Sequence, residues 1–213
     1  GGFADDELHR AAASFVAASS KAEGSVTERA KKDAGKDAEA QQRVVEHRVV
    51  HNAYGLLQAA STHSGLMART GGSERPFLLS RAFFVGSARY GAVWTGDNTA
   101  TWEHLRLSFA MVLTLALSGH SFAGADVGGF FGTPSPELLT RWYQAASYLP
   151  FFRGHAHIDV PRREPYLLPP PYASAAIEAI RERQRLSPYW ATLWYAAAET
   201  DPGLGLPIVA PPW

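Results

Sequence analysis

The amino-acid sequence predicts an α/β fold, namely roughly half of a (β/α)8 barrel preceded by a charged, low-complexity insertion. Short, nearly continuous apolar runs, typical of strands covered on both faces, alternate with longer segments that carry apolar residues at helical spacing. The connections are short, which favours right-handed parallel βαβ units. Polar residues stand where the apolar runs end, and the carboxyl ends of the strands share one pocket in a parallel barrel.

The first 43 residues differ in composition from the rest of the chain. Phe3 and Phe15 are their only aromatic residues, and they contain no proline. The stretch from Lys21 to Arg43 is rich in alanine and in charges of both signs, so it cannot bury enough apolar surface to offset its ordering entropy. We expect a helix-prone or disordered insertion, with a short amphipathic helix over about 6–18.

The expected domain boundaries are an insertion at 1–43, a partial barrel at 44–205 and the start of a following segment at 206–213. All eight units of a barrel need about 250 residues, so this chain suffices for roughly half. It opens at Gly1 without an initiator methionine and stops at Trp213 within an apolar run. Both ends are therefore expected to be cuts in a longer polypeptide.

The first expected elements of the barrel are a helix and two strands. The helix covers about 45–60 and its segment ends at Gly71-Gly72. The apolar run at 77–84 predicts a strand covered on both faces, and 91–94 predicts a second strand.

Two helices with identifiable starts come next. Thr99 is placed to cap a helix whose apolar face lies within 102–116 and which Gly119 ends. Ser135-Pro136 supplies an N-cap and a first-turn proline for another helix.

The remaining segments continue the alternation. The run at 121–125 predicts a third strand, and 150–153 predicts a fourth. A proline-rich loop follows at 162–171. A last helix over about 175–198 must bend or restart at Pro188, because proline removes a helical hydrogen bond.

The composition excludes several classes of partner. Twenty basic and twenty acidic residues cancel, so there is no electrostatic case for nucleic acid or for an anionic membrane. No window approaches a membrane span, and the absence of cysteine excludes disulfides. The aromatic content suits carbohydrate binding but is also ordinary core material. The tryptophans expected in the core, on helix faces, are Trp102, Trp142, Trp190 and Trp194.

Candidate functional residues stand where the apolar runs end. Asp97 follows the 91–94 run beside a glycine, and Arg81, Asp126 and His155 occupy similar points of other segments. Each has a structural alternative. Asp97 alone is more typical of a turn, Arg81 suits an ion pair with a barrel aspartate, and Asp126 suits a cap of the glycine turn that follows it. In a functional pocket, Asp126 is expected to hold Arg81 or a ligand hydroxyl.

A second pattern, His155-x-His157 with Asp159, has a spacing that suits metal ligands. Divalent metal sites need three or four converging ligands, and nothing else in the sequence supplies a clear one. We therefore expect no metal and no cofactor.

Long motifs along the chain are similar to those of one enzyme family. They are Glu46-His47-Arg48 with His51-Asn52, RAFFVGSARYGAVWTGDNTATWEHL at 81–105, GADVGGFF at 124–131, RWYQAASYLPFFRGHAH at 141–157 and RREPYLL at 162–168. Over about residues 44–213 the chain resembles glycoside hydrolase family 31. Within that family it is most similar to the endoplasmic-reticulum enzymes that trim glucose from N-glycans.

The resemblance implies a retaining α-glucosidase, of whose barrel this chain would be the C-terminal half. Asp97 matches the general acid/base of the family. The family's nucleophile lies in a W-x-D-M-N-E-P-type motif, which is not found here and would precede residue 1. The positions that match residues of the sugar subsite next to the cleaved bond are Arg81, Trp94, Asp126, Phe130, Arg153 and His155.

The resemblance also implies partners and a location. They are an α-glucoside or glycan substrate, the missing N-terminal half of the barrel, a regulatory β subunit, and the lumen of the endoplasmic reticulum. The chain departs from the family at Val49, where aspartate is usual, and at Ala210, where arginine is frequent. The alternatives are another family 31 enzyme (an α-xylosidase, a starch α-glucosidase or a glucan lyase) and a non-catalytic truncated product.

Overall fold

The computed structural model describes residues 46–199 and 207–211. The expected insertion at 1–43, with its helix over 6–18, lies outside them. The described helices are α2 (His47–Val50), α3 (Tyr54–Arg69), α4 (Trp102–Leu117), α5 (Pro136–Ala146), α6 (Tyr172–Arg185) and α7 (Ser187–Glu199), with short 3-10 turns η1 (His51–Ala53), η2 (Ser87–Arg89) and η3 (Pro165–Leu167).

The strands are short, and those in the described part of the chain pair in parallel. β1 (Leu79–Ser80), β2 (Ala92–Trp94) and β3 (Ala123–Gly124) form one sheet in that order. β4 (Asp126–Val127) pairs with β5 (Arg153–Gly154), with Asp126 opposite Arg153. The predicted α/β class with parallel strands is confirmed.

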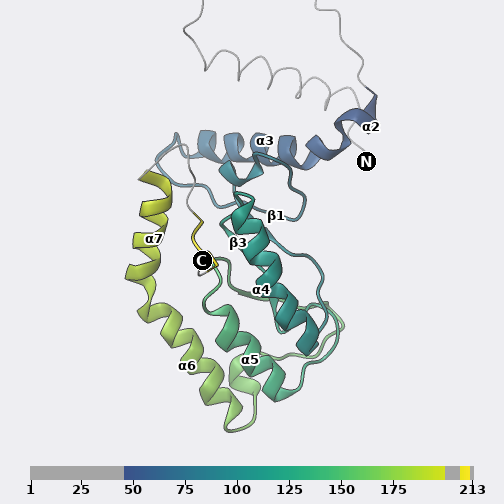
Figure 1. The fold of residues 1–213 in the computed structure, drawn as a ribbon, viewed down its shortest axis with the longest axis vertical. Coiled ribbons are helices and arrows are strands. Elements are labelled where there is room, and N and C mark those ends of the chain that lie inside the picture. The colour runs from purple at the N-terminus through teal and green to yellow at the C-terminus, as the bar shows by residue number, and fades with distance from the viewer. Residues whose placement is uncertain (1–45, 200–206, 212–213) are drawn as a thin grey trace, which may run out of the picture.

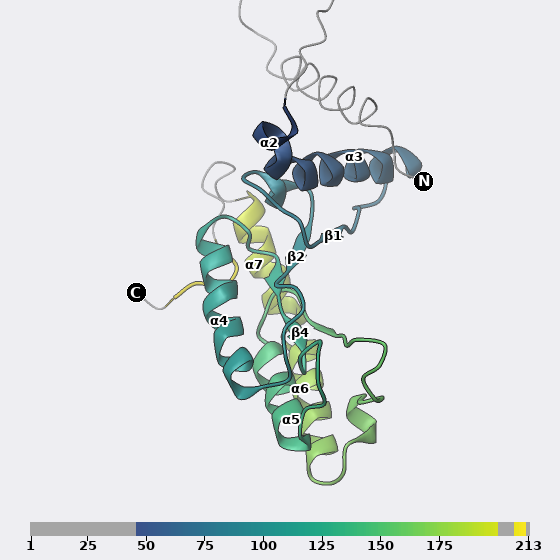
Figure 2. The same cartoon turned by 90° about the vertical axis from the view of Figure 1, so that its right-hand side faces the viewer.

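The helices pack along one side of these strands. In Figure 1, α4 and α5 run beside the strands, and α6 with α7 forms a bent column next to α5. α3 lies across one end of this arrangement. Figure 2, turned by 90°, places the strands between α4 on one side and the loop that joins β5 to α6 on the other.

The core forms where α4, α5 and α6 meet the strands. Val112 of α4, Trp142 of α5 and Ala176 of α6 are fully buried, together with Ala123 and Val127 of the strands. Burial of apolar surface contributes about 25 cal/mol per Å², so this cluster is the main stabilising feature of the described body.

Four tryptophans were expected in the core. The prediction is confirmed for Trp142 and is wrong for Trp102. Trp102 is the first residue of α4 and is 52% exposed, because it precedes the part of the helix that meets the strands. Trp190 and Trp194 are half-buried on α7, where Trp194 packs edge-on against Phe122.

The helix starts were predicted with one error. Ser135 caps α5 as expected, since its side chain accepts a hydrogen bond from the Leu138 N–H at 3.2 Å. The cap of α4 is Thr101 rather than Thr99, and its hydroxyl accepts from the His104 N–H. The Thr99 N–H instead donates to the His104 ring at 2.8 Å. Thr99 is thus used to close the loop before the helix, and the observed cap lies two residues after the predicted one.

The predicted strand at 77–84 is wrong in extent and in burial. Only Leu79 and Ser80 pair with β2, and Phe77, Phe84 and Val85 are exposed, Val85 by 81%. β1 is the edge of the described sheet, so within the described residues its far side has no strand to extend the pairing.

The C-terminal half follows the predicted order with small shifts. The strand predicted at 150–153 corresponds to β5, which is observed at Arg153–Gly154. The proline-rich loop at 162–171 contains η3. The predicted interruption of the last helix is confirmed. α6 ends at Arg185, and α7 restarts with Pro188 in its first turn, where a missing N–H costs least.

Candidate active site

Asp97 stands at the end of β2 and faces Arg81. After Trp94 the chain turns at Gly96, whose φ of 85° favours glycine and whose added Cβ would lie 3.1 Å from the Arg81 guanidinium. Arg81 Nη1 lies 3.4 Å from Asp97 Oδ2, and the Asp97 side chain is 33% exposed. Asp97 is therefore held beside a cation and open to a ligand. The ion pair that the sequence allowed for Arg81 is made with the candidate acid itself.

Asp126, at the start of β4, is in the opposite environment. Its side chain is 0% exposed, and its Oδ1 accepts a 2.6 Å bond from Arg153 Nη2 on β5. The partner expected for Asp126 was Arg81 or a hydroxyl. Arg153 takes that place because the β4–β5 register sets the two residues opposite each other.

Burial raises the pKa of Asp126, and the bond from Arg153 opposes this rise. The charges of His155 and Asp97 also act on this carboxyl, which places them in the same electrostatic neighbourhood. Its second oxygen, Oδ2, has no hydrogen-bond partner within the described residues. A buried acceptor of this kind suits a hydroxyl-bearing ligand.

Arg153 connects Asp126 to the aromatic wall of the site. Its guanidinium carbon lies 5.1 Å from the centre of the Trp94 ring and 5.4 Å from that of Phe151. These cation–π contacts hold the guanidinium in place while it neutralises Asp126.

Phe130 and His155 come together from two different loops. Their ring centres are 5.4 Å apart, and His157 packs edge-on against Phe130 at 5.6 Å. His157 Nδ1 lies 3.3 Å from an Asp159 carboxylate oxygen. Within residues 46–199 and 207–211, no group of three or more His, Cys, Asp or Glu side chains is placed to hold a metal.

The sequence interpretation missed Arg163, which organises the same loops. Its guanidinium donates to the backbone carbonyls of Gly128 (2.7 Å), His155 (2.7 Å) and Gly129. Desolvation lowers the pKa of Arg163, yet carbonyl dipoles surround the cation. Arg163 therefore ties the turn before Phe130 to the loop of His155. An arginine in a proline-rich loop gives no local signal of this role.

A cleft of about 240 Å³ opens beside Asp97. It is lined by Thr95, Asp97, Asn98, His104, Leu107, Ser108 and Met111. It lies between the end of β2 and one face of α4, and it gives a ligand a route to the Asp97 carboxylate.

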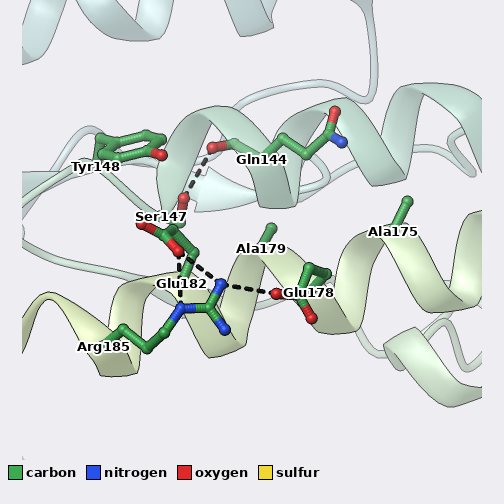
Figure 3. A pocket seen from close by; sticks show the side chains of 8 residues that line it. All are labelled: Gln144, Ser147, Tyr148, Ala175, Glu178, Ala179, Glu182 and Arg185. Atoms are coloured by element: carbon green, nitrogen blue, oxygen red, sulfur yellow. Dashed lines mark hydrogen bonds and ion pairs between the residues drawn. The ribbon is translucent and has the colours of Figure 1, made fainter.

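A larger groove of about 460 Å³, between α5 and α6, lies away from these residues. Figure 3 shows that Arg185 pairs with Glu178 and Glu182 and that Ser147 Oγ donates to the Gln144 carbonyl. Arg185 lies 2.6 Å from carboxylate oxygens of both Glu178 and Glu182. With these charges already paired, the groove is the weaker candidate for a site.

The parallel strands bring carboxylates, arginines and aromatic rings to one edge, which is the arrangement of a catalytic α/β-barrel domain. The family described as "Glycosyl hydrolases family 31 TIM-barrel domain" matches residues 12–193. The chain belongs to this family. None of the helices described here has the length and apolar character needed to cross a membrane.

Relatives with high identity are α-glucosidases. Neutral alpha-glucosidase AB of Mus musculus is 57% identical over 168 residues, which are 79% of this chain and 17% of the relative. The probable glucan 1,3-alpha-glucosidase of Arabidopsis thaliana is 56% identical over 169 residues, 79% of this chain and 18% of the relative. The chain thus spans less than a fifth of the length of these relatives.

Solved structures of the family have the same fold. The glucosidase II alpha subunit, in a form bound to alpha3-Glc2, matches with a TM-score of 0.73 and 51% identity over 78% of this chain and 18% of that one. The family 31 alpha-glucosidase of Bacteroides thetaiotaomicron matches with a TM-score of 0.71 and 38% identity, over 77% of this chain and 27% of that one.

Proposed function

We propose that this chain supplies the general acid/base and most of the glucose subsite of a retaining α-glucosidase. The observation that carries the proposal is the placement of Asp97. It ends a barrel strand, faces Arg81 at 3.4 Å, stays partly open to solvent and borders a cleft. A carboxyl group in this setting can meet the oxygen of a leaving sugar, provided that it is protonated on arrival.

The reaction needs a second carboxylate, because retaining hydrolysis uses two groups about 5–5.5 Å apart. One attacks the anomeric carbon and forms a glycosyl ester. The other protonates the departing oxygen and then takes a proton from the water that releases the sugar. Asp126 does not suit the attack, since it is fully buried and bound to Arg153. In the proposal the nucleophile comes from a strand outside this chain, as the family resemblance implies.

The remaining residues have roles in holding the sugar. Arg81 lies beside Asp97 and hydrogen-bonds hydroxyls, while the free Oδ2 of Asp126 accepts from a hydroxyl. His155 donates to another hydroxyl. Trp94 and Phe130 supply ring faces, on which a pyranose stacks. Arg153 pairs with Asp126 and opposes the rise of its pKa that burial causes.

The proposed substrate is terminal α-linked glucose on N-glycans. The support is similarity to proteins named glucosidase II alpha subunit and glucan 1,3-alpha-glucosidase. One matching structure is described as an ER glucosidase II heterodimer of a catalytic subunit and the binding domain of a regulatory subunit. By analogy we place the intact protein in the endoplasmic reticulum with a β-subunit partner.

The test compares the purified chain 1–213 with the longer polypeptide that contains it. The chain alone should not cleave an aryl α-glucoside, because the attacking carboxylate is absent. The longer polypeptide should hydrolyse an α-1,3-linked glucose disaccharide faster than an α-1,4-linked one. Asp97→Asn should lower that rate by about 10²–10⁴-fold, the usual contribution of a general acid/base. Cleavage by 1–213 that is lost on Asp97→Asn would overturn the proposed division of the two carboxylates.

A further inference from the structure

The residue after the candidate acid, Asn98, connects the Asp97 loop to the next strand-end loop through its side chain. Asn98 Nδ2 donates to the Asp126 carbonyl at 3.0 Å, and Asn98 Oδ1 accepts from the Phe130 N–H at 2.9 Å. Both ends of one amide are therefore used, and both partners belong to the loop that carries the sugar-binding side chains.

The backbones of the two loops strengthen this connection. The Asn98 carbonyl accepts from the N–H groups of Phe130 (2.7 Å) and Phe131 (2.9 Å), and the Ala100 N–H donates to the Phe131 carbonyl at 2.8 Å. The loops approach so closely that a Cβ added to Gly129 would lie 2.4 Å from the Ala100 nitrogen. Residues 98–100 and 129–131 therefore act as one unit.

Asp97 itself has little else to fix its position. The described structure gives its side chain one ion-pair partner, Arg81, at the long distance of 3.4 Å, and both side chains are partly exposed. An exposed pair of this kind contributes little energy and orients a carboxylate weakly. The direction in which Asp97 leaves the main chain is consequently set by the residue that follows it.

We infer that Asn98 is a positioning residue for the acid/base. By fastening the Asp97 backbone to the Asp126–Phe130 loop, it holds the carboxyl group at a set distance from the sugar that this loop binds. Reacting groups must be placed to within a fraction of an ångström, and a displacement of about 1 Å can cost about 10²-fold in rate. This inference rests on the proposed function and concerns the same site.

The inference predicts an effect that depends on the leaving group. Cleavage of a disaccharide needs a proton on the departing sugar oxygen, whereas fluoride leaves from α-glucosyl fluoride with little help from an acid. A displaced Asp97 should therefore slow the disaccharide far more than the fluoride. A loss of folded protein or of glucose binding would slow both equally.

The experiment measures kcat/KM for both substrates in the longer polypeptide that contains this chain. Asn98→Ala removes both side-chain bonds, and Asn98→Ser is a second variant that keeps a small polar group in case the alanine variant does not fold. Arg183→Lys is the matched control, because Arg183 also bonds backbone carbonyls, those of Ser147, Leu149 and Pro150, at the other end of α5. Thermal unfolding of each variant shows how much of the activity loss shared by both substrates comes from reduced stability.

The Asn98 variants should lose at least about tenfold more activity on the disaccharide than on the fluoride, while Arg183→Lys should lose both to the same extent. Equal losses for the Asn98 variants would show a structural role only and overturn the inference. The Asp97→Asn variant distinguishes failure of the inference about Asn98 from failure of the proposed function. If Asp97→Asn also showed no dependence on the leaving group, the assignment of Asp97 as the acid would be wrong.

Discussion

Asp97, which follows β2, and Asp126, which begins β4, are in opposite environments. Asp97 is partly exposed beside Arg81, which follows the edge strand β1, whereas Asp126 is enclosed and bound to Arg153. A proton donor must reach the substrate, and a group that fixes the ligand gains from a dry, preorganised setting. The two positions suit these two roles.

The Asp126–Arg153 pair is expected to matter for stability as well as for binding. Replacing Arg153 by Met removes the cation and leaves a buried carboxylate unpaired, which should cost about 3–5 kcal/mol in the free energy of unfolding. The double variant Arg153→Met/Asp126→Asn should recover part of that loss, because it leaves no buried charge. Urea unfolding of the longer polypeptide measures both. A double variant less stable than the single one would contradict this account.

The pH dependence of the Arg153→Met variant has a definite sign. Burial already raises the pKa of Asp126, and loss of Arg153 removes the main opposing interaction. A folded-state pKa above the unfolded value means that the folded protein binds more protons, so stability falls as pH rises through that window. The variant should lose stability from the ordinary aspartate range up to the raised pKa, and Asp126→Asn should abolish this trend.

At the same scale, the fold class led to the expectation that Asp97, Arg81, Asp126 and His155 share one pocket, but it did not indicate how they pair. Arg153 was named only through the family resemblance. The choice of Arg153 over Arg81 as the partner of Asp126 depends on strand register. The roles of Asn98 and Arg163 depend on contacts between loops far apart in sequence.

At the scale of elements, helices were predicted better than strands. The start of α5 is encoded locally by Ser135 and Pro136, and the break between α6 and α7 by Pro188. Strands of two or three residues are defined by their neighbours, so an apolar run cannot set their length. The run at 77–84 illustrates this, because only two of its residues pair.

The cap of α4 gives an element-scale test. Thr101→Ala removes the hydroxyl that accepts from the His104 N–H, so it should lower the free energy of unfolding by about 1 kcal/mol. Thr99→Ala is the matched control and should cost less, because the Thr99 backbone, which the substitution keeps, donates to the His104 ring and accepts from the Thr101 N–H. Urea unfolding of both variants measures the difference. A larger loss for Thr99→Ala would contradict the observed helix start.

At the scale of the whole molecule, the described sheet has edges that a complete barrel would close. β1 borders no further strand, and Phe77, Phe83, Phe84 and Val85 near it are exposed. An unpaired strand edge with exposed apolar side chains near it suits an interface. We propose that the strand that brings the nucleophile covers it, so that the barrel and the catalytic pair are completed together.

The product formed with azide tests the central claim most directly. The complete enzyme with Asp97→Ala is given α-glucosyl fluoride and azide, and the configuration of the glucosyl azide is read by NMR. If Asp97 is the acid/base, the nucleophile still forms a β-linked glycosyl ester, and azide displaces it from the opposite face to give α-glucosyl azide. If Asp97 were instead the nucleophile, azide would attack the substrate directly. β-Glucosyl azide would then form, and the assignment of Asp97 would be wrong.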